Sequence, residues 1–455
     1  MSQEEFNGVH MIPFGLLICF VDELEVRVTE LSEKGFCFRV PQKLEKISRI
    51  RLHYFVFEQS CYEEIVIRDY RIEERREQDF FVEYLVLSEQ EDYRKCSREL
   101  IQDYWDYISV KLLGDEAYLS AERTGYPAAL DGEHYDTFEE QKRIWFSEVA
   151  QTAEGGEFPS DLELAIELDG PKWYKAYLEL EFGAMMESYW EENGLRHHAF
   201  CRKRPERIYI GNQFCHHLFP EKKVLFSMLE KSEREDLKVT ISFSYLRDFT
   251  LEETENLLQE LEQWCHDRGT TFEILVNDWG MAQLLRGRDQ CLTPCLGVLL
   301  NKRRKDVRYR YKKGFWTRED KKNPGPLGEN SVNAWWYREY LREELRIERY
   351  EFEMCGYFLD IPEGRHSLHL PFFQTNTSQY CPLYAKCVTK DRGNQRLAKQ
   401  CPEYCREFVF LYPAHLNMVG RYNSLFGFDS RSICDMELLK VYRDQGIDRI
   451  VVNLM

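Results

Sequence analysis

Four cysteines near the C-terminal end of the chain have a spacing that could bind a metal. They are Cys381, Cys387, Cys401 and Cys405. The last two stand four residues apart, so one helical turn would place both thiols on the same face, where they could share a metal or a cluster. Four thiolates also suit a tetrahedral zinc ion. The remaining alternative is that these are ordinary buried cysteines.

Two carboxylates at the ends of predicted strands are candidate catalytic groups. Asp278 lies in the sequence Asn277-Asp278-Trp279-Gly280, and Glu353 lies on a strand predicted over Tyr350–Met354. A carboxylate that faces the inside of a barrel needs a partner or a catalytic task. The alternatives are that Asp278 caps the helix that follows it, and that Glu353 pairs with a lysine or arginine nearby.

A basic segment, residues 302–322, interleaves lysines and arginines with aromatic residues. It holds eleven Lys or Arg against three acidic residues. Basic and stacking side chains together suit RNA, whose bases stack on exposed rings. The simpler alternative is a solvated loop. The candidate RNA-binding residues are Arg303, Arg304, Arg308, Tyr309, Arg310 and Tyr311.

The C-terminal part, residues 201–455, alternates between predicted strands and predicted helices. This alternation predicts parallel strands and a (β/α) TIM-like barrel, in which chemistry collects at strand ends. Cys215 and Asp278 both follow such ends. The predicted strands are Arg207–Gly211, Val239–Tyr245, Phe272–Asn277, Cys295–Leu300, Tyr350–Met354, Phe408–Leu411 and Ile450–Leu454.

The rest of the chain predicts two further regions, which makes the protein multidomain. Residues 1–112 contain short β-rich runs with period-two alternation, as in Ile50, Leu52 and Tyr54, and predict a small antiparallel β-barrel closed by a helix. Residues 113–200 carry apolar residues at helical spacing and predict a helical connector.

Composition narrows the class of protein. The 61 basic residues against 79 acidic ones give a net charge of −18, which argues against nucleic-acid binding by the whole surface. We find no signal peptide and no apolar stretch long enough for a membrane helix. The 15 cysteines are therefore expected to stay reduced in the cytoplasm, and the clustered ones to serve metal binding or catalysis rather than disulfides.

The chain resembles the peptidase U-thirty-two family, once called collagenase-like peptidases, over about residues 205–455. The resemblance rests on Ile208-Tyr209-Ile210-Gly211 with Cys215 beyond it, on Asn277-Asp278-Trp279-Gly280, and on the pair Cys401 and Cys405. The nearest likeness is to the iron–sulfur members of the oxygen-independent ubiquinone hydroxylation pathway.

This resemblance implies a 4Fe–4S cluster held by Cys215, Cys387, Cys401 and Cys405, with Cys381 as the alternative to Cys387. It implies an oxygen-independent hydroxylation or related modification of RNA or a small aromatic molecule, and a homologous partner subunit. A long segment, Asp360–Gln379, stands as an insertion before the cysteines. A peptidase of the same family is the alternative activity, although no activated nucleophile with an adjacent base is visible.

The N-terminal region resembles a degenerate PilZ domain. The segment Arg27-Val28-Thr29-Glu30-Leu31-Ser32 has Glu30 where these domains carry Asp or Asn, and Arg27 is the only arginine before Ser32. PilZ domains grip cyclic di-GMP with a pair of arginines, which provide forked contacts. We therefore do not expect cyclic di-GMP binding here. A non-catalytic regulatory binding protein is the third hypothesis.

Overall fold

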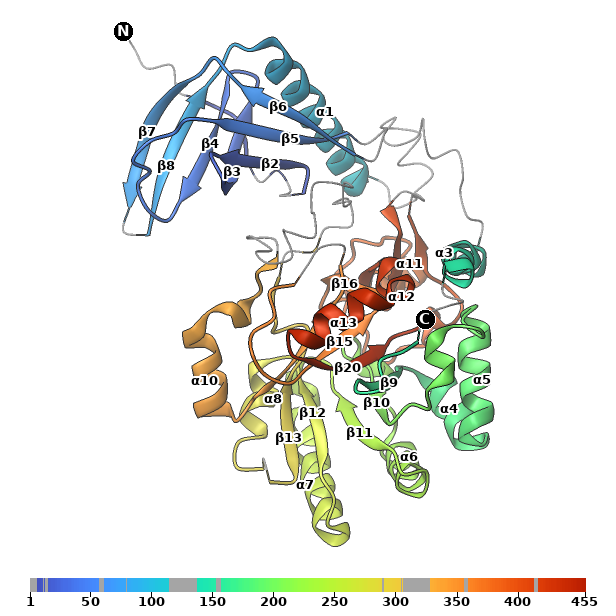
Figure 1. Ribbon diagram of the computed structural model, residues 1–455. Helices are drawn as coiled ribbons and strands as arrows, with labels where there is room; N and C mark the ends of the chain where they lie inside the picture. Colours follow the sequence, from blue (N-terminus) through green and yellow to red (C-terminus); the bar gives the residue numbers. More distant parts are fainter. Residues whose placement is uncertain are drawn as a thin grey trace. The chain divides into compact units, whose positions relative to one another are not determined.

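The computed structural model describes residues 6–10, 12, 15–56, 61–78, 80–113, 137–152, 157–288, 290–303, 305, 328–355, 359–412 and 416–455. Its contacts divide the chain into two compact units. One comprises Met1–His134, Asp306–Pro326 and Tyr412–Asn417, and the other Tyr135–Lys305, Leu327–Leu411 and Met418–Met455. Figure 1 shows the elements of both units.

The N-terminal unit is an antiparallel sheet, which confirms the predicted class of this region. Its eight strands follow the order β6-β5-β2-β3-β4-β8-β7, and β1 pairs with β3. The strands are β1 (Val9–His10), β2 (Leu17–Val21), β3 (Leu24–Ser32), β4 (Gly35–Val40), β5 (Ile50–Val56), β6 (Cys61–Ile67), β7 (Arg71–Gln78) and β8 (Phe81–Leu87).

Helix α1 (Glu91–Leu113) covers one face of this sheet. The predicted alternation holds on β5, where Ile50, Leu52 and Tyr54 are all buried. The Tyr54 hydroxyl lies 2.8 Å from Ser97 Oγ of the helix. The buried face of β5 is thus fastened to α1 by packing and by one hydrogen bond.

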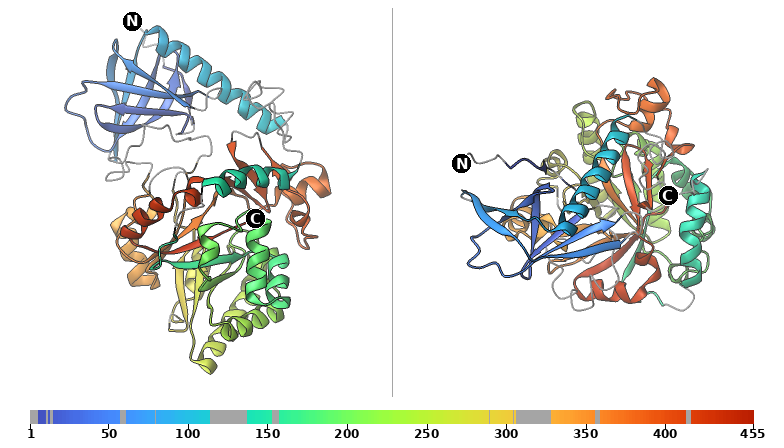
Figure 2. Two further views of the ribbon diagram at one scale, coloured as in Figure 1. Left: turned by 45° about the vertical axis from the view of Figure 1, so that its right-hand side comes forward. Right: turned by 90° about the horizontal axis from the view of Figure 1, so that it is seen from above.

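The second unit contains a closed barrel of eight parallel strands, as predicted for a TIM-like fold. Helices alternate with the strands and surround them (Figure 2). The barrel strands are β9 (Glu163–Leu168), β10 (Arg207–Gly211), β11 (Lys238–Ser242), β12 (Phe272–Val276), β13 (Leu292–Leu296), β14 (Arg349–Glu353), β15 (His366–Leu370) and β20 (Ile447–Val452).

The helices of this unit lie before and between these strands. The α-helices are α3 (Phe138–Thr152), α4 (Pro171–Glu179), α5 (Phe182–Glu192), α6 (Lys222–Arg234), α7 (Leu251–Arg268), α8 (Trp279–Leu284), α10 (Trp335–Leu345), α11 (Pro382–Thr389), α12 (Arg431–Cys434) and α13 (Met436–Asp444). The 3-10 turns are η1 (Ala199–Arg202), η2 (His216–Leu218), η3 (Asp248–Thr250), η5 (Ser331–Asn333) and η6 (Tyr404–Arg406).

The interior of the barrel is filled in layers. Near the amino ends of the strands, Arg449 bonds Glu273 at 2.6 Å and Glu163 at 3.0 Å, and Arg207 bonds Glu163 at 2.9 Å. Above these ion pairs is a small apolar layer, made of Ala165, Tyr209, Leu275, Cys295 and Val451. A buried charge is tolerated when it is paired, so the ionic layer is stable only because its charges meet across the strands.

Two of the barrel strands correct the predictions from sequence. β9 pairs with both β10 and β20, so the barrel begins inside residues 113–200, which were predicted as a helical connector. β15 pairs with β14 and β20, so the predicted insertion Asp360–Gln379 contains a barrel strand. Both strands point charged or imidazole side chains into the barrel. Their sequences therefore contain polar residues where a buried strand usually has apolar ones, a pattern that is typical of an exposed segment.

A second sheet is inserted between β15 and β20. It is antiparallel, with the order β16-β19-β18-β17. The prediction that Phe408–Leu411 is a barrel strand is wrong. These residues include β17, which in the described structure pairs with β18 of this sheet and not with a barrel strand. The strands of the sheet are β16 (Phe372–Thr377), β17 (Phe410–Leu411), β18 (Met418–Arg421) and β19 (Ser424–Phe428). The four clustered cysteines lie between β16 and β17 in chain order.

Candidate metal centre

Cys215 is placed at the carboxyl end of β10 by a local turn. The side-chain oxygen of Asn212 accepts hydrogen bonds from the backbone amides of Phe214 and Cys215, both at 2.9 Å. Burial is the main cause of the raised pKa of the Cys215 thiol, and the thiols of Cys381, Cys405 and Cys401 raise the pKa further. The backbone amide of His217 acts in the opposite direction by donating to the sulfur.

Cys381 stands at the start of α11 and is held at its sulfur. The thiol donates to the carbonyl oxygen of Tyr422 at 3.1 Å and accepts from the amide of Tyr384 at 3.4 Å. Burial raises the pKa of Cys381, and two neighbouring thiols, Cys401 and Cys387, raise it further. Cys387 lies later on the same helix.

Cys401 and Cys405 belong to the turn that ends in η6. Cys401 accepts a hydrogen bond from the amide of Glu403 at 3.4 Å. Burial raises the pKa of Cys405 to about 12; the guanidinium of Arg421 opposes that shift, while Cys381 and Cys401 add to it. Cys405 therefore has both thiols and a cation within electrostatic range.

The fold brings Cys215 together with the late cysteines, although they are far apart in sequence. Three of the late thiols raise the pKa of Cys215: those of Cys381, Cys401 and Cys405. Those of Cys381 and Cys401 also raise the pKa of Cys405. The thiol of Cys387 is close enough to raise the pKa of Cys381. Within the described ranges, no group of three Cys, His, Asp or Glu side chains is arranged to hold one metal ion. The thiols are thus neighbours that do not converge on a single point.

A second polar constellation, which the sequence did not indicate, lies inside the carboxyl end of the barrel. The His369 ring is 1% exposed and lies between two carboxylates, with Nδ1 3.0 Å from Glu167 Oε1 and Nε2 2.7 Å from Glu351 Oε2. Burial alone would lower the pKa of His369, but the two ion pairs outweigh it and raise the pKa to about 10. His369 is therefore an imidazolium at neutral pH.

The imidazolium continues into the ionic layer of the barrel. Tyr209 lies with its hydroxyl 3.3 Å from both oxygens of Glu351, and Arg449 donates to that hydroxyl at 3.0 Å. A hydrogen-bonded line thus runs from Glu167 to Arg449. The available signal was the alternation of charged and small residues on β9, β14, β15 and β20, which periodicity alone does not separate from a solvated strand.

Comparison of the chain with protein-family models, with curated proteins and with solved structures finds no match. In the described part of the chain, no helix combines the length and the apolar character needed to cross a bilayer.

The two predicted catalytic carboxylates both form hydrogen bonds or ion pairs with other groups of the protein. Asp278 caps α8, with Oδ1 accepting from the amide of Met281 at 3.0 Å and Oδ2 from the amide of Leu246 at 2.7 Å. Glu353 is buried, pairs with the ammonium of Lys305, and accepts from the amide of Gln374 at 2.7 Å. These contacts match the structural alternatives given for each residue.

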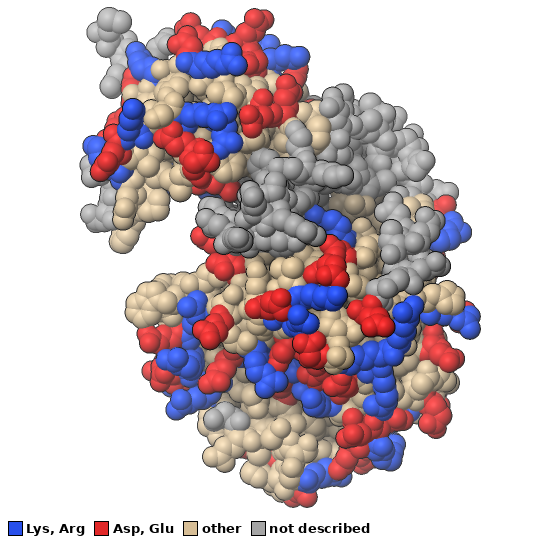
Figure 3. Space-filling view, viewed as in Figure 1, with Lys and Arg blue, Asp and Glu red and all other residues tan. Residues whose placement is uncertain are grey.

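The predicted RNA-binding segment is described only at its beginning. Arg303 donates to the carbonyl oxygen of Glu353 at 2.9 Å. Arg304, Arg308, Tyr309, Arg310 and Tyr311 lie outside the described residues, so binding of RNA there stays a prediction. On the face drawn in Figure 3, acidic and basic side chains are interspersed over the described barrel surface.

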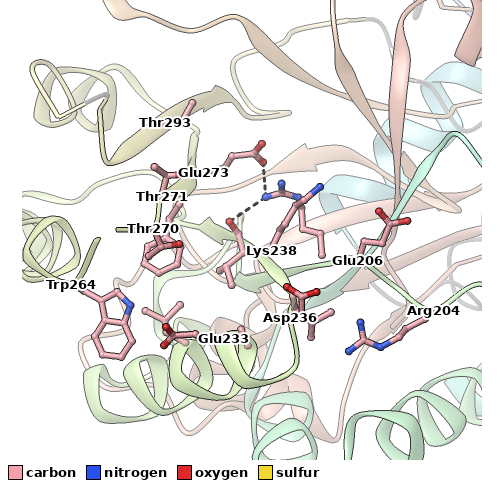
Figure 4. A pocket seen from close by; sticks show the side chains of 16 residues that line it. Arg204, Glu206, Glu233, Asp236, Lys238, Trp264, Thr270, Thr271, Glu273 and Thr293 are labelled. Atoms are coloured by element: carbon pink, nitrogen blue, oxygen red, sulfur yellow. Dashed lines mark hydrogen bonds and ion pairs between the residues drawn. The ribbon is translucent and has the colours of Figure 1, made fainter. Parts of the chain in front are cut away.

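A pocket of about 680 Å³ lies at the opposite, amino end of β10–β12 (Figure 4). Two of its basic side chains pair with barrel glutamates, since Arg207 lies 3.1 Å from Glu273 and Lys238 lies 3.5 Å from Glu163. A third, Arg204, lies 3.5 Å from Glu235, just after α6. Catalysis in barrels of this class takes place at the carboxyl end of the strands. We therefore assign the ion pairs in this pocket to stability.

Proposed function

We propose that the barrel is an iron–sulfur protein. Cys215, Cys401 and Cys405 hold a 4Fe–4S cluster together with one of Cys381 and Cys387, and the protein carries out an oxygen-independent hydroxylation or related modification of RNA or a small aromatic molecule. The observation that carries the proposal is the gathering of thiols from two distant segments at the carboxyl end of the barrel. The family resemblance adds the type of reaction and a homologous partner subunit.

The arrangement of the thiols favours a cluster over a zinc ion. Tetrahedral zinc needs its sulfur ligands about 2.3 Å from one point. Among the described residues, no three Cys, His, Asp or Glu side chains are placed to hold one metal ion. A 4Fe–4S cluster takes one thiolate on each of its irons, so its ligands lie farther apart. Neighbouring thiols that do not converge therefore fit the cluster better.

The protein environment also fits a charged cofactor. Burial and mutual repulsion raise the pKa of Cys215, Cys381 and Cys405, so the protein alone keeps these groups as thiols. A bound metal supplies the positive charge that favours thiolates. Backbone amides that donate to Cys215 and Cys381, and the guanidinium of Arg421 near Cys405, stabilise these thiolates.

In this proposal the cluster, when bound, supplies electron transfer or activation of the oxygen donor. The residues of the chain hold it and shield it. Cys215 is 9% exposed, and Phe214 beside it packs edge-on against Phe426 at 5.1 Å between ring centroids. These groups limit access of water to the thiols on the side of the barrel.

Anaerobic purification followed by iron, sulfide and zinc analysis tests the proposal. We expect about four irons per chain and a visible absorption that bleaches on reduction. Serine variants of Cys215, Cys401 and Cys405 should each lose the iron, whereas Cys201→Ser serves as the matched control. The Cys201 thiol donates to the carbonyl of Leu195 at 2.8 Å and interacts with none of the clustered cysteines in the described residues.

Separate variants of Cys381 and Cys387 identify the fourth ligand. Loss of iron in only one of them assigns the site. The mutual interaction of Cys381 with Cys215 and Cys405 supports Cys381, and the sequence resemblance supports Cys387. A colourless protein with one zinc and no iron would overturn the cluster, and full iron content in Cys215→Ser would overturn the ligand set.

A further inference from the structure

A small cavity lies inside the carboxyl end of the barrel. Its volume is about 20 Å³, and Glu167, Asp169, Gln213 and Tyr422 are among its lining residues. A cavity needs roughly 10–15 Å³ and two to four polar partners to hold one water molecule. The space therefore has the size of a single water.

Two oxygen atoms at this cavity need a hydrogen-bond donor. Gln213 Oε1 and Asp169 Oδ1 are buried and have no hydrogen-bond partner among the described residues. The other polar atoms of both side chains are engaged. Gln213 Nε2 donates to Glu167 Oε1 at 2.8 Å, and Asp169 Oδ2 accepts from the Tyr422 hydroxyl and lies 3.7 Å from Arg421 Nη1. Gln213 is only 4% exposed. An unmet buried acceptor costs free energy, and one water has the two protons that these acceptors require.

The cavity also adjoins the buried imidazolium. Glu167 lines it and pairs with His369 Nδ1. On its other side the ring faces Glu351, whose carboxylate bonds the Tyr209 hydroxyl. That hydroxyl in turn lies against Ser367 and Arg449, and the Arg449 guanidinium stays protonated. Glu167 is therefore the side through which a proton of His369 can leave the barrel interior.

We propose that one ordered water occupies this cavity and carries protons between the His369–Glu167 pair and Asp169. A proton passes from His369 Nδ1 to Glu167, from Glu167 to the water, and from the water to Asp169, which leaves a neutral imidazole and a protonated Asp169. Glu167 and the water regain their starting forms. The reverse sequence reloads the imidazole. Delivery of this proton to a reaction at the barrel mouth rests on the proposed function, whereas the path itself does not.

Hydrogen exchange of the His369 ring protons tests the path without any cofactor. The full chain is labelled with ¹⁵N-histidine, and the ring N–H signals are assigned with His369→Gln. Each rate is divided by the rate of the same group in the unfolded chain, and we expect the ring protons to be much less protected than the backbone amide of Leu368, the preceding residue on β15, which is fully buried. Equal protection of both would mean that solvent reaches the ring only when the barrel opens, and would overturn the proposal.

Variants then locate the path. Asp169→Asn keeps the shape but cannot carry the proton, and Gln213→Leu removes an acceptor of the water; each should slow ring exchange by about tenfold or more. Tyr209→Phe is the control, because it alters the Glu351 side and leaves the cavity lining intact. Equal exchange in all three variants would overturn the proposal. A high-resolution crystal structure with no density in the cavity would do the same.

Discussion

The ion pairs of His369 predict a specific dependence of stability on pH. Its pKa is about 10 in the folded protein against 6.5 for an ordinary histidine. The unfolded chain releases the proton as pH rises above about 6.5, while the folded protein keeps it until the pH approaches about 10. The stabilisation is thus complete below the lower value and is lost as pH rises through the window.

The magnitude follows from this difference of one bound proton. Between about pH 7 and about pH 9 the free energy of unfolding should fall by about 1.4 kcal/mol per pH unit because of this group, or about 3 kcal/mol over the interval. Because the ring and Glu351 are almost fully buried, solvent screening reduces this figure little. Other groups add their own dependence, so a reference protein is required.

The reference is the double variant His369→Gln with Glu351→Gln, which removes the proton and one carboxylate together. Urea unfolding of both proteins at several pH values gives two slopes, and we expect the natural protein to have the steeper decline by about 1.4 kcal/mol per pH unit. Parallel slopes would mean that His369 is neutral in the fold. They would refute the argument from its ion pairs.

Three further substitutions test the barrel and its mouth. Gly211→Ala should destabilise by more than the ~1 kcal/mol typical of an ordinary helix or strand site, because its φ is +115° and a side chain would strike a carbonyl of β11; Gly269→Ala, with φ +63° and open space around it, is the control in urea unfolding. Lys305→Met should cost about 3–5 kcal/mol by leaving buried Glu353 without its cation, and a second change, Glu353→Leu, should restore much of it in thermal unfolding. Asp278→Ala should cost about 1–2 kcal/mol as a lost helix cap while iron content stays unchanged, and loss of iron in this variant would contradict its role as a cap.

The class of fold could be predicted because most barrel strands are apolar and alternate with amphipathic helices. The strands β10, β11, β12 and β14 lie within one or a few residues of their predicted bounds. β9 and β15 escaped prediction because Glu163, Glu167, His366 and His369 give them a polar pattern. Glu163, Glu167 and His369 pair with side chains of other strands, and such long-range pairing is invisible in a local window.

The candidate metal centre could likewise be predicted only in part. Spacing alone singled out the late cysteines, and a strand end singled out Cys215. Their proximity depends on the insertion that follows β15, which no local pattern reveals. The roles of Asp278 and Glu353 could be framed as two alternatives, but the choice needed the amide of Leu246 and the ammonium of Lys305.

The clustered cysteines come from two parts of the chain that are far apart in sequence, the turn after β10 and the insertion between β15 and β20. The proposed cluster, held by both parts, would close a loop that includes five further barrel strands, and such closure would lower the entropy of the unfolded chain. Binding of the cluster would therefore stabilise the barrel against unfolding. Digestion by a protease should then attack the segment around Lys399 and Arg406 far sooner in an iron-free chain than in a loaded one.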